Sequence, residues 1–206
     1  MKKIDTVIIS GGLGTRFKKI QSIPKILTKF NNQLILDIII KNLDRFGLKK
    51  IHFLCGKNTK IISKFTKSDK RYFFYEEEKL LGTAGCLSNL NKKKLSNDIL
   101  IIFGDLLFDI DFSRFFKFHK EKKSDVTVFS HPSDHLYDSD ILDVNSNGVI
   151  KKIFFKPHKK KIISNNLTMA GLFIIKKKIL NEIKKNKKND FSRYFLRKLI
   201  KQNKKI

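Results

Sequence analysis

Three glycines and two basic residues near the start of the chain could together bind an anion. Gly11, Gly12 and Gly14 follow a short apolar run of β-branched residues, and Arg16 and Lys25 come after them. Because glycine has no Cβ, main-chain N–H groups there can approach an anion closely. The two cationic side chains would supply positive charge to the same anion. The stretch therefore predicts a phosphate-binding loop at the end of a buried strand.

Two familiar phosphate-binding loops are excluded by the residues at decisive positions. A P-loop requires a second glycine followed directly by Lys and Ser or Thr, and no such run follows Gly14. The dinucleotide fingerprint requires glycine at position 17, which is Phe17 in this chain. A glycine-rich turn that binds no ligand is the simpler alternative for this stretch.

An acidic residue after a second apolar run could hold a metal ion. Residues 98–103 are predicted as a central strand, and Gly104 and Asp105 come directly after it. A carboxylate at the tip of a buried parallel strand is costly unless it meets a cation. Mg²⁺ bound by a carboxylate and by substrate phosphates would meet that need. The alternative is that Asp105 caps the turn that follows.

A second run of small residues, at 81–85, follows three glutamates and is predicted to open a helix. Gly82 and Thr83 would allow the close approach of a flat ligand and present free N–H groups to it. A helix start chosen only for packing is the alternative.

Alternating strands and helices are expected to position these residues. The predicted strands are residues 7–9, 50–54, 72–76, 98–103, 126–129, 141–144, 149–155 and 168–175. The predicted helices are residues 34–46, 58–65, 81–90, 111–122, 176–186 and 190–202, with Asn58 and Asp111 as N-caps. This order predicts an α/β fold with a Rossmann-like, mixed and mostly parallel central sheet flanked by helices. In such a sheet, ligands bind outside the carboxyl ends of the strands.

Length and composition narrow the class of protein. The 206 residues, 41% of them hydrophobic, predict a single α/β domain that covers residues 1–206. No apolar run reaches membrane-spanning length and no signal-peptide pattern opens the chain. Cys55 and Cys86 stand apart without a C-x-x-C motif. We therefore expect a cytoplasmic protein with no membrane partner and no metal cluster bound by cysteine.

The net charge of +26 makes nucleic acid a rival partner. The lysines are spread through every segment beside Asn and Ile, residues that AT-rich codons encode, so compositional drift is the simpler explanation. A nucleic-acid site would need a localised basic stripe with aromatic residues, which the sequence does not show. We expect no nucleic-acid partner, although the charge favours anionic substrates in general. His131 and His135 lie in a turn-rich segment whose spacing matches no metal-ligand set, so it is predicted as a surface loop.

The pattern GGxGTR followed by Pro24-Lys25 resembles the signature of the sugar-1-phosphate nucleotidyltransferases, also called NDP-sugar pyrophosphorylases. An LGTAG segment and a Gly-Asp pair follow in the family's order, and an Asp-Phe pair at 190–191 resembles the one before the family's late helix. The pattern is most similar to guanylyltransferase-like members that act on mannose-1-phosphate or D-glycero-D-manno-heptose-1-phosphate. The resemblance implies a GT-A-like fold, Mg²⁺ as cofactor, and a place in nucleotide-sugar synthesis for lipopolysaccharide or capsule.

The resemblance also implies roles for individual residues. Arg16, Lys25 and Asp105 would be catalytic, and Asp105 would hold the metal. The residues implied to bind the nucleotide are Gly11, Gly12, Gly14, Thr15, Glu77, Gly82 and Thr83. Lys156 and Gly171 would bind the sugar phosphate, and residues 131–140 would line the same side.

The chain departs from the family pattern in several places. Lys79-Leu80 stands where relatives have Glu-Pro, and Phe103 replaces an Asn before Gly-Asp. Phe155 replaces a Glu before Lys-Pro, and Met169 replaces an Asn that hydrogen-bonds sugar hydroxyls. No Asp-x-Gly-Thr segment, which carries a second metal-binding Asp in relatives, occurs between residues 189 and 206. We expect a domain truncated at its C-terminal end. A homo-oligomer and, in a longer chain, a fused phosphatase domain stay open.

The predicted reaction joins a nucleoside triphosphate, with GTP favoured, to a mannose- or heptose-type sugar-1-phosphate and releases pyrophosphate. Two alternatives stay open. One is a non-catalytic or regulatory nucleotide-sugar-binding fragment of the same fold, and the other is a basic nucleic-acid-binding module. The residues do not determine the base, the sugar or the oligomeric state.

Overall fold

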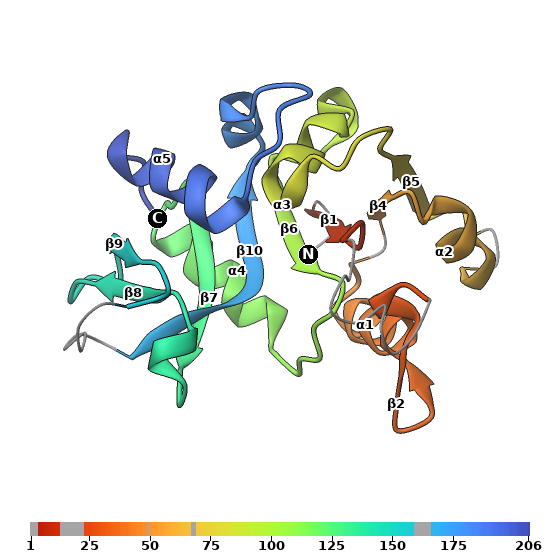
Figure 1. Cartoon of the computed structure of the whole chain (residues 1–206), viewed down its shortest axis with the longest axis horizontal. Coiled ribbons are helices and arrows are strands. Elements are labelled where there is room, and N and C mark those ends of the chain that lie inside the picture. Colours follow the sequence, from red (N-terminus) through yellow and green to blue (C-terminus); the bar gives the residue numbers. More distant parts are fainter. Residues whose placement is uncertain (1–3, 13–22, 49, 67–68, 159–165) are drawn as a thin grey trace.

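A mixed sheet of eight strands forms the centre of the computed structural model, which describes residues 4–12, 23–48, 50–66, 69–158 and 166–206. The strands follow the path β5 (Tyr72–Glu76), β4 (Ile51–Gly56), β1 (Ile4–Ile9), β6 (Asp98–Phe103), β10 (Leu167–Lys176), β8 (Ile141–Val144) and β9 (Ile150–Phe154), and β7 (Val126–Pro132) pairs with β10. The strands from β5 to β6 are mutually parallel, whereas β10 is antiparallel to β6, β7 and β8. The predicted α/β fold with a mixed central sheet is confirmed (Figure 1). The expectation that this sheet is mostly parallel is wrong, because the pairings of β10 with β6, β7 and β8 and of β8 with β9 are antiparallel and only three described pairings are parallel.

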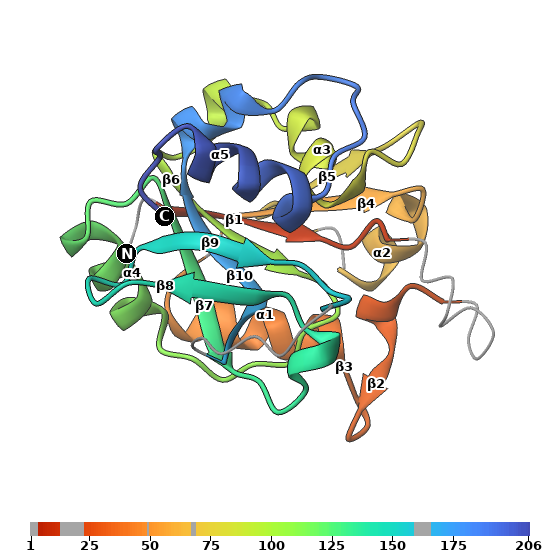
Figure 2. The ribbon, with the colours of Figure 1, turned by 60° about the vertical axis from the view of Figure 1, so that its left-hand side comes forward.

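Helices cover both faces of this sheet (Figure 2). On one face lie α1 (Ile35–Arg45), α2 (Thr59–Phe65) and α4 (Phe112–Glu121), and on the other lie α3 (Gly82–Gly85) and α5 (Arg197–Lys201). Of the described residues, none belongs to a helix with the length and apolar character needed to cross a membrane.

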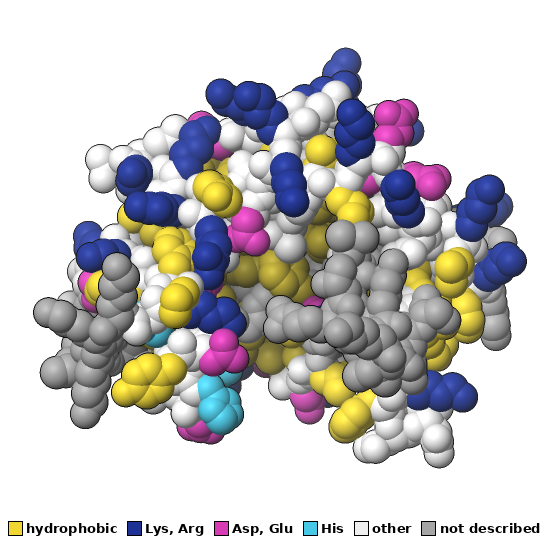
Figure 3. Space-filling view, viewed as in Figure 1, with side chains coloured by type: hydrophobic (Ala, Val, Ile, Leu, Met, Phe, Trp, Pro, Cys, Tyr) yellow, Lys and Arg dark blue, Asp and Glu magenta, His cyan; other side chains and the backbone are white. Residues whose placement is uncertain are grey.

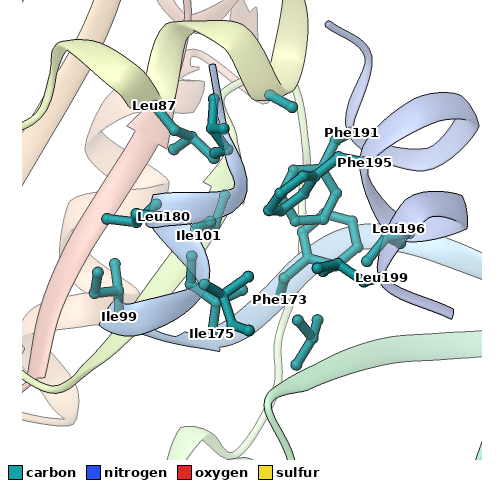
Figure 4. Packing of buried hydrophobic residues seen from close by; sticks show 14 of the residues in the cluster. Leu87, Ile99, Ile101, Phe173, Ile175, Leu180, Phe191, Phe195, Leu196 and Leu199 are labelled. Atoms are coloured by element: carbon teal, nitrogen blue, oxygen red, sulfur yellow. The ribbon is translucent and has the colours of Figure 1, made fainter. Parts of the chain in front are cut away.

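The apolar core is divided in two by the sheet because successive strand residues point to opposite faces. Val7 packs into the cluster under α3 and α5, and its neighbour Ile8 packs into the cluster under α1, α2 and α4. On the α5 side, the rings of Phe191 and Phe195 lie against β10 (Figure 4). The ring centroids of Phe173 and Phe191 are 4.3 Å apart, so the segment before α5 is anchored to the sheet by aromatic packing.

Short elements connect the larger ones. A two-stranded sheet forms from β2 (Lys29–Phe30) and β3 (Gln33–Leu34). The 3-10 helices are Lys25–Leu27, Cys86–Asn89, Lys92–Lys94, Leu136–Asp138 and Lys177–Glu182, and a π-helical turn covers Phe191–Leu196.

Three predicted helices are shorter or more irregular than expected, because tertiary contacts outweigh local propensity. In the predicted helix at 81–90, α3 has four residues and its Ala84 and Gly85 N–H groups donate to Asn189 O at 3.0 and 3.2 Å. The predicted helix at 176–186 is a 3-10 helix that ends before Ile183, which is extended and buried. The predicted helix at 190–202 begins as a π-helical turn whose first N–H groups are capped by the Asp190 side chain.

The predicted N-caps had different outcomes. Asp111 caps α4 as predicted, since its side chain accepts a hydrogen bond from Arg114 N at 3.1 Å. Asn58 stands at the N-cap of α2, but its side chain makes no capping hydrogen bond.

Candidate active site

The carboxyl ends of β1, β4, β5 and β6 are tied together into one edge of the sheet. Gly104 N, after β6, donates to Ile9 O of β1 at 2.9 Å, and Glu77 N, after β5, donates to Gly56 O of β4 at 3.1 Å. These bonds hold the loops that follow the parallel strands beside one another, where ligands bind in open α/β sheets. Gly11, Glu77 and Asp105 therefore lie on neighbouring loops at this edge, whereas Lys156 follows β9 and Gly171 lies within β10.

Lys25 and Asp105 form an ion pair at this edge. Lys25 Nζ donates to Asp105 Oδ2 at 2.9 Å, and both side chains are 44% exposed. Lys25 begins a 3-10 helix that is anchored by the buried side chains of Ile26 and Leu27. The cation beside the Asp105 carboxylate is, within the described residues, the Lys25 ammonium group. The carboxylate is exposed, however, so the burial that led us to expect a cation there is not observed. Gly14, Thr15 and Arg16 lie outside the described residues.

The first two glycines of the loop have different surroundings. A Cβ on Gly11 would lie 2.6 Å from Gly56 N, so glycine is needed there for the main chains after β1 and β4 to approach each other. At Gly12 a Cβ would meet no atom of a described residue within 4 Å, and the residue is exposed. The missing side chain of Gly11 is thus explained by packing, whereas the main chain at Gly12 is open to a ligand.

A pocket of about 190 Å³ lies beside this loop. Five of the residues that the resemblance implied for nucleotide binding line it, namely Gly11, Gly12, Glu77, Gly82 and Thr83. Lys188 lines it as well, although no motif in the sequence distinguishes it from the many other lysines. Tertiary structure thus brings together segments that follow β1, β5 and β10.

Glu77 places a buried carboxylate in this pocket. The residue is 5% exposed, and its Oε2 accepts a hydrogen bond from Leu81 N at 3.4 Å. Its Oε1 is buried and has no hydrogen-bond partner among the described residues. Burial raises the pKa of this carboxyl group above its ordinary value. An unpaired buried oxygen is costly, so it marks a position where a ligand donor would bind favourably.

A second pocket, of about 320 Å³, adjoins the first, and Thr83 lines both. Its floor is hydrophobic, and Figure 3 shows a hollow near the centre of this face with hydrophobic side chains at its base. Lys156 and Gly171, both implied for the sugar phosphate, line it together with Asp138 and Asp140. This pocket combines an apolar floor with a charged rim.

Lys156 is held at the rim by the segment at 131–140. Its Nζ donates to Asp138 O at 2.6 Å and to Asp138 Oδ1 at 3.0 Å, and its main-chain N donates to Asp140 Oδ1 at 3.1 Å. The three residues Asp138, Ser139 and Asp140 all line the second pocket.

Gly171 shapes the second pocket through the backbone. It has φ +76°, and a Cβ there would lie 3.0 Å from side-chain atoms of Leu106 and Phe103. The register between β10 and β7 shifts between Met169 and Phe173, so the strand bends at the pocket. The positive φ and the close packing explain why position 171 is a glycine.

Asp190 links the two pockets, and the only sign of it in the sequence was the Asp-Phe pair. Thr83 Oγ1 donates to Asp190 Oδ2 at 3.3 Å and accepts from Phe191 N at 2.8 Å. Asp190 also lines the second pocket. The start of α3 is therefore positioned by the segment that leads into α5.

The Asp105 carboxylate is a candidate ligand for a metal ion that also contacts substrate phosphates. In the part of the chain that the structure describes, no group of three or more His, Cys, Asp or Glu residues could hold a metal ion. Mg²⁺ is commonly bound by one or two carboxylates together with substrate phosphates. The exposed Asp105 carboxylate, whose Oδ1 receives no hydrogen bond from a described residue, fits that mode of binding.

The chain is similar to known proteins over nearly its whole length. The family described as Nucleotidyl transferase matches residues 5–206. A Campylobacter jejuni protein named D-glycero-alpha-D-manno-heptose 1-phosphate guanylyltransferase is 26% identical over 196 residues, which are 93% of this chain and 84% of the relative. A Sulfolobus acidocaldarius protein described as a mannose-1-phosphate guanyltransferase is 27% identical over 202 residues, 96% of this chain. The match covers 54% of that relative, so the chain spans about half of its length.

A solved structure is similar over most of the chain. The crystal structure of HddC from Yersinia pseudotuberculosis complexed with GMP-PN has a TM-score of 0.77 and is 25% identical, covering 94% of this chain and 85% of HddC.

Proposed function

The chain belongs to the nucleotidyl transferase family, and from that premise we propose that it transfers a guanylyl group from GTP to a sugar-1-phosphate of the mannose or heptose type. The names of the two relatives and the guanine nucleotide in the similar structure support this choice of substrates. The observation that carries the proposal is the Lys25–Asp105 pair, which lines neither of the two adjoining pockets but lies next to Leu106 of the second one.

In the proposed reaction, a phosphate oxygen of the sugar-1-phosphate attacks the α-phosphorus of GTP. A new P–O bond forms while the bond from that phosphorus to the oxygen of the departing pyrophosphate breaks. Such a transfer needs positioning and charge neutralisation more than covalent catalysis by the protein. Two cavities side by side suit it, because each substrate can be held in one of them.

The glycine loop and its basic residues would hold the triphosphate. The main chain at Gly12 is open to a ligand within the described residues, and Gly14, Thr15 and Arg16 follow it in the sequence. The Lys25 ammonium would donate to phosphate oxygens near the reacting phosphorus, where negative charge increases in the transition state. Its existing bond to Asp105 keeps it at the edge of the sheet before substrate binds.

The Asp105 carboxylate would hold Mg²⁺ together with the phosphates. When bound, the ion would neutralise charge on the phosphate oxygens and withdraw electron density from the phosphorus. Lys25 would then face both the carboxylate and the phosphates, so the pair would align the metal ligand and the substrate.

The buried Oε1 of Glu77 favours guanine in the first pocket. An ionised carboxylate accepts hydrogen bonds and cannot donate them. Guanine carries an amino group and a ring N–H on one edge, whereas uracil presents a single N–H between two carbonyl oxygens that an acceptor would repel. A base with two adjacent donors is therefore the best match for this carboxylate.

The second pocket would take the sugar phosphate. Lys156 would exchange its contacts with Asp138 for the phosphate, and the main chain at Gly171 would lie beside the sugar. Asp138, Asp140 and Asp190 offer carboxylates for sugar hydroxyls, in a chain that has Met169 where relatives carry an Asn.

A pyrophosphate-release assay tests the reaction. The four ribonucleoside triphosphates and dTTP are combined with mannose-1-phosphate, glucose-1-phosphate and a heptose-1-phosphate, with Mg²⁺ present. We expect the fastest release with GTP and a mannose- or heptose-type phosphate. Release with none of the pairs, alongside measurable binding of GDP-mannose, would instead favour the nucleotide-sugar-binding alternative.

A matched pair of lysine variants tests the role of Lys25. Lys25→Ala should lower turnover by about 10²–10³-fold, as expected for the loss of one electrostatic contact to the transition state. Lys29→Ala removes a nearby exposed lysine on β2 and should leave turnover unchanged. Equal turnover in the two variants would refute the assignment of Lys25.

A further inference from the structure

A pocket rich in lysine lies at the opposite end of β6 and β10 from the proposed catalytic edge. Its volume is about 560 Å³, which is ample for a small molecule. It opens where β6 begins and β10 ends, at the paired residues Asp98 and Lys176. The residues that line this lysine pocket are Lys92, Asn97, Asp98, Lys120, Lys176, Lys177, Lys178 and Asn181.

The walls of the lysine pocket come from separate elements that are bonded to one another. Lys92 belongs to the 3-10 helix Lys92–Lys94, and Lys120 lies near the end of α4. Lys177 N donates to Asn97 O at 2.7 Å, which joins the segment after β10 to the segment before β6. The shape of the pocket is therefore set by tertiary hydrogen bonds.

Two carboxylates neutralise part of its charge. Asp98 is buried and pairs with Lys120, and Asp125 lies 2.8 Å from Lys178 Nζ and 3.7 Å from Lys176 Nζ. These two acids account for three of the five lysines that line the pocket.

The other two lysines have no such compensation. Lys92 Nζ donates to Leu180 O at 3.2 Å and to Asn181 Oδ1 at 3.0 Å, and Lys177 Nζ donates to Leu95 O at 3.1 Å. These acceptors are neutral, and no carboxylate of the described residues lies within ion-pair distance of either ammonium group. Both lysines are half-buried, so their charges are held in place. Each ammonium group has three donors and uses only part of them here.

We propose that the lysine pocket is a second anion site, which binds a compact and multiply charged phosphate chain. Phosphate oxygens accept charge-assisted hydrogen bonds from ammonium groups and would compensate the charges of Lys92 and Lys177. The concave shape suits a short di- or triphosphate better than an extended polymer. Such a chain occurs both as inorganic polyphosphate and as the phosphate tail of a nucleotide, and the two sources are separated by experiment.

The test uses the full chain carrying Lys25→Ala, so that the catalytic edge is weakened as a competing site. Inorganic tripolyphosphate is titrated calorimetrically without divalent metal at about 0.15 M NaCl, where weak surface attraction is screened. The double change Lys92→Gln and Lys177→Gln should weaken binding by at least about tenfold, because two charge-assisted contacts are lost. Lys41→Gln with Lys64→Gln removes the same charge from exposed positions on α1 and α2 and should leave binding within about twofold of the parent, since no contact is lost.

Additional variants and ligands control for a fold defect and identify the bound anion. Lys92→Arg keeps the positive charge and should therefore keep the binding of tripolyphosphate. Thermal unfolding of every variant shows whether weaker binding comes from a damaged fold or from the loss of the anion contact. GTP is also titrated into the chain carrying Lys25→Ala. If GTP binds more tightly than tripolyphosphate and its binding depends on Lys92 and Lys177, the phosphate chain that this pocket binds is the tail of a nucleotide. Equal weakening in the two double variants would overturn the proposal, as would tighter and equally lysine-dependent binding of a single-stranded oligonucleotide.

Discussion

The two edges of the sheet use aspartate and lysine in opposite ways. At the carboxyl edge, Asp105 meets Lys25 in an open pair whose side chains are both 44% exposed. At the amino edge, Asp98 has a side chain that is 8% exposed and lies between Lys120 and His119. Asp98 is the first residue of β6, and Asp105 follows the last residue of the same strand by two positions. Their difference shows that the surrounding donors, and not the residue type, decide whether a carboxylate is available to a ligand.

Asp5 repeats the closed arrangement at the amino edge. Its Oδ2 accepts hydrogen bonds from Ser96 N at 2.8 Å and from Lys50 Nζ at 3.2 Å, and it lies 3.8 Å from His52 Nε2. A carboxylate surrounded by donors has little capacity left for a substrate or a metal ion. The amino-edge aspartates are therefore expected to stabilise the fold, and Asp105 is expected to serve the reaction.

The largest expected effect separates function from stability at Asp105. Asp105→Asn should lower kcat/KM for pyrophosphate release by about 10²–10³-fold, since the variant loses the metal-binding charge. Its free energy of unfolding should change by no more than about 0.5 kcal/mol, because the pair with Lys25 is exposed. Asp109→Asn, which removes another exposed acid paired with Arg45, is the control and should leave both quantities unchanged. Normal turnover in Asp105→Asn would contradict the comparison of the two edges.

The next effect is on stability at the opposite edge. Asp98→Asn should lower the free energy of unfolding by about 1–3 kcal/mol in urea titrations, because His119 and Lys120 lose a charged acceptor. Hydrogen bonding from His119, together with Lys120, lowers the pKa of Asp98 to about 2 from its ordinary 3.8. A depressed native pKa contributes stability above the unfolded value and loses it as the pH falls. The difference between wild type and variant should thus disappear between about pH 4 and pH 2. If wild type is still more stable than Asp98→Asn at about pH 2, the charge of Asp98 is not the cause of the difference.

A smaller effect is expected on the choice of base. Glu77→Gln replaces one acceptor oxygen of the first pocket by an amide donor. The preference for GTP over UTP, measured as a ratio of kcat/KM values, should fall by about tenfold, within the 1–3 kcal/mol that a bidentate contact to a base contributes. Glu78→Gln changes an adjacent exposed glutamate and should preserve the preference. An unchanged preference in Glu77→Gln would place recognition of the base elsewhere.

The smallest effect is the pH dependence of stability at Glu77, and its sign is opposite to that of Asp98. Burial raises the pKa of Glu77 above its ordinary 4.5, so the folded protein binds this proton more tightly than the unfolded chain does. Stability is then highest below the unfolded pKa and falls as the pH rises through the native value. Relative to Glu77→Gln, wild type should therefore be more stable at about pH 4 than at about pH 7 in matched urea titrations. The reverse slope would mean that this carboxylate is compensated in the folded protein.

Local pattern explains why most elements were predictable. Apolar runs and helical spacing depend only on residues a few positions apart, and the predicted strand at 72–76 and helix at 58–65 lie where β5 and α2 are observed. The segments at 176–186 and 190–202 were harder, because the aromatic and aliphatic residues there bend the chain to reach the sheet. For the site, motifs in the sequence indicated that Lys25, Asp105 and Glu77 could contact a ligand. The hydrogen-bond partners of these residues within the protein could not be predicted.

By itself, the sequence determined the family, the order of strands and helices along the chain, and the residues able to bind a phosphate or a metal ion. Only the tertiary structure decided which carboxylates are exposed enough to bind a ligand. Asp98 and Asp105 are separated by one strand, yet Lys120 and His119 enclose the first, while Lys25, 80 residues from Asp105, leaves the second open. The reason is physical: hydrogen bonds and burial depend on which strands lie side by side, and that arrangement is a property of the whole chain and not of any short segment.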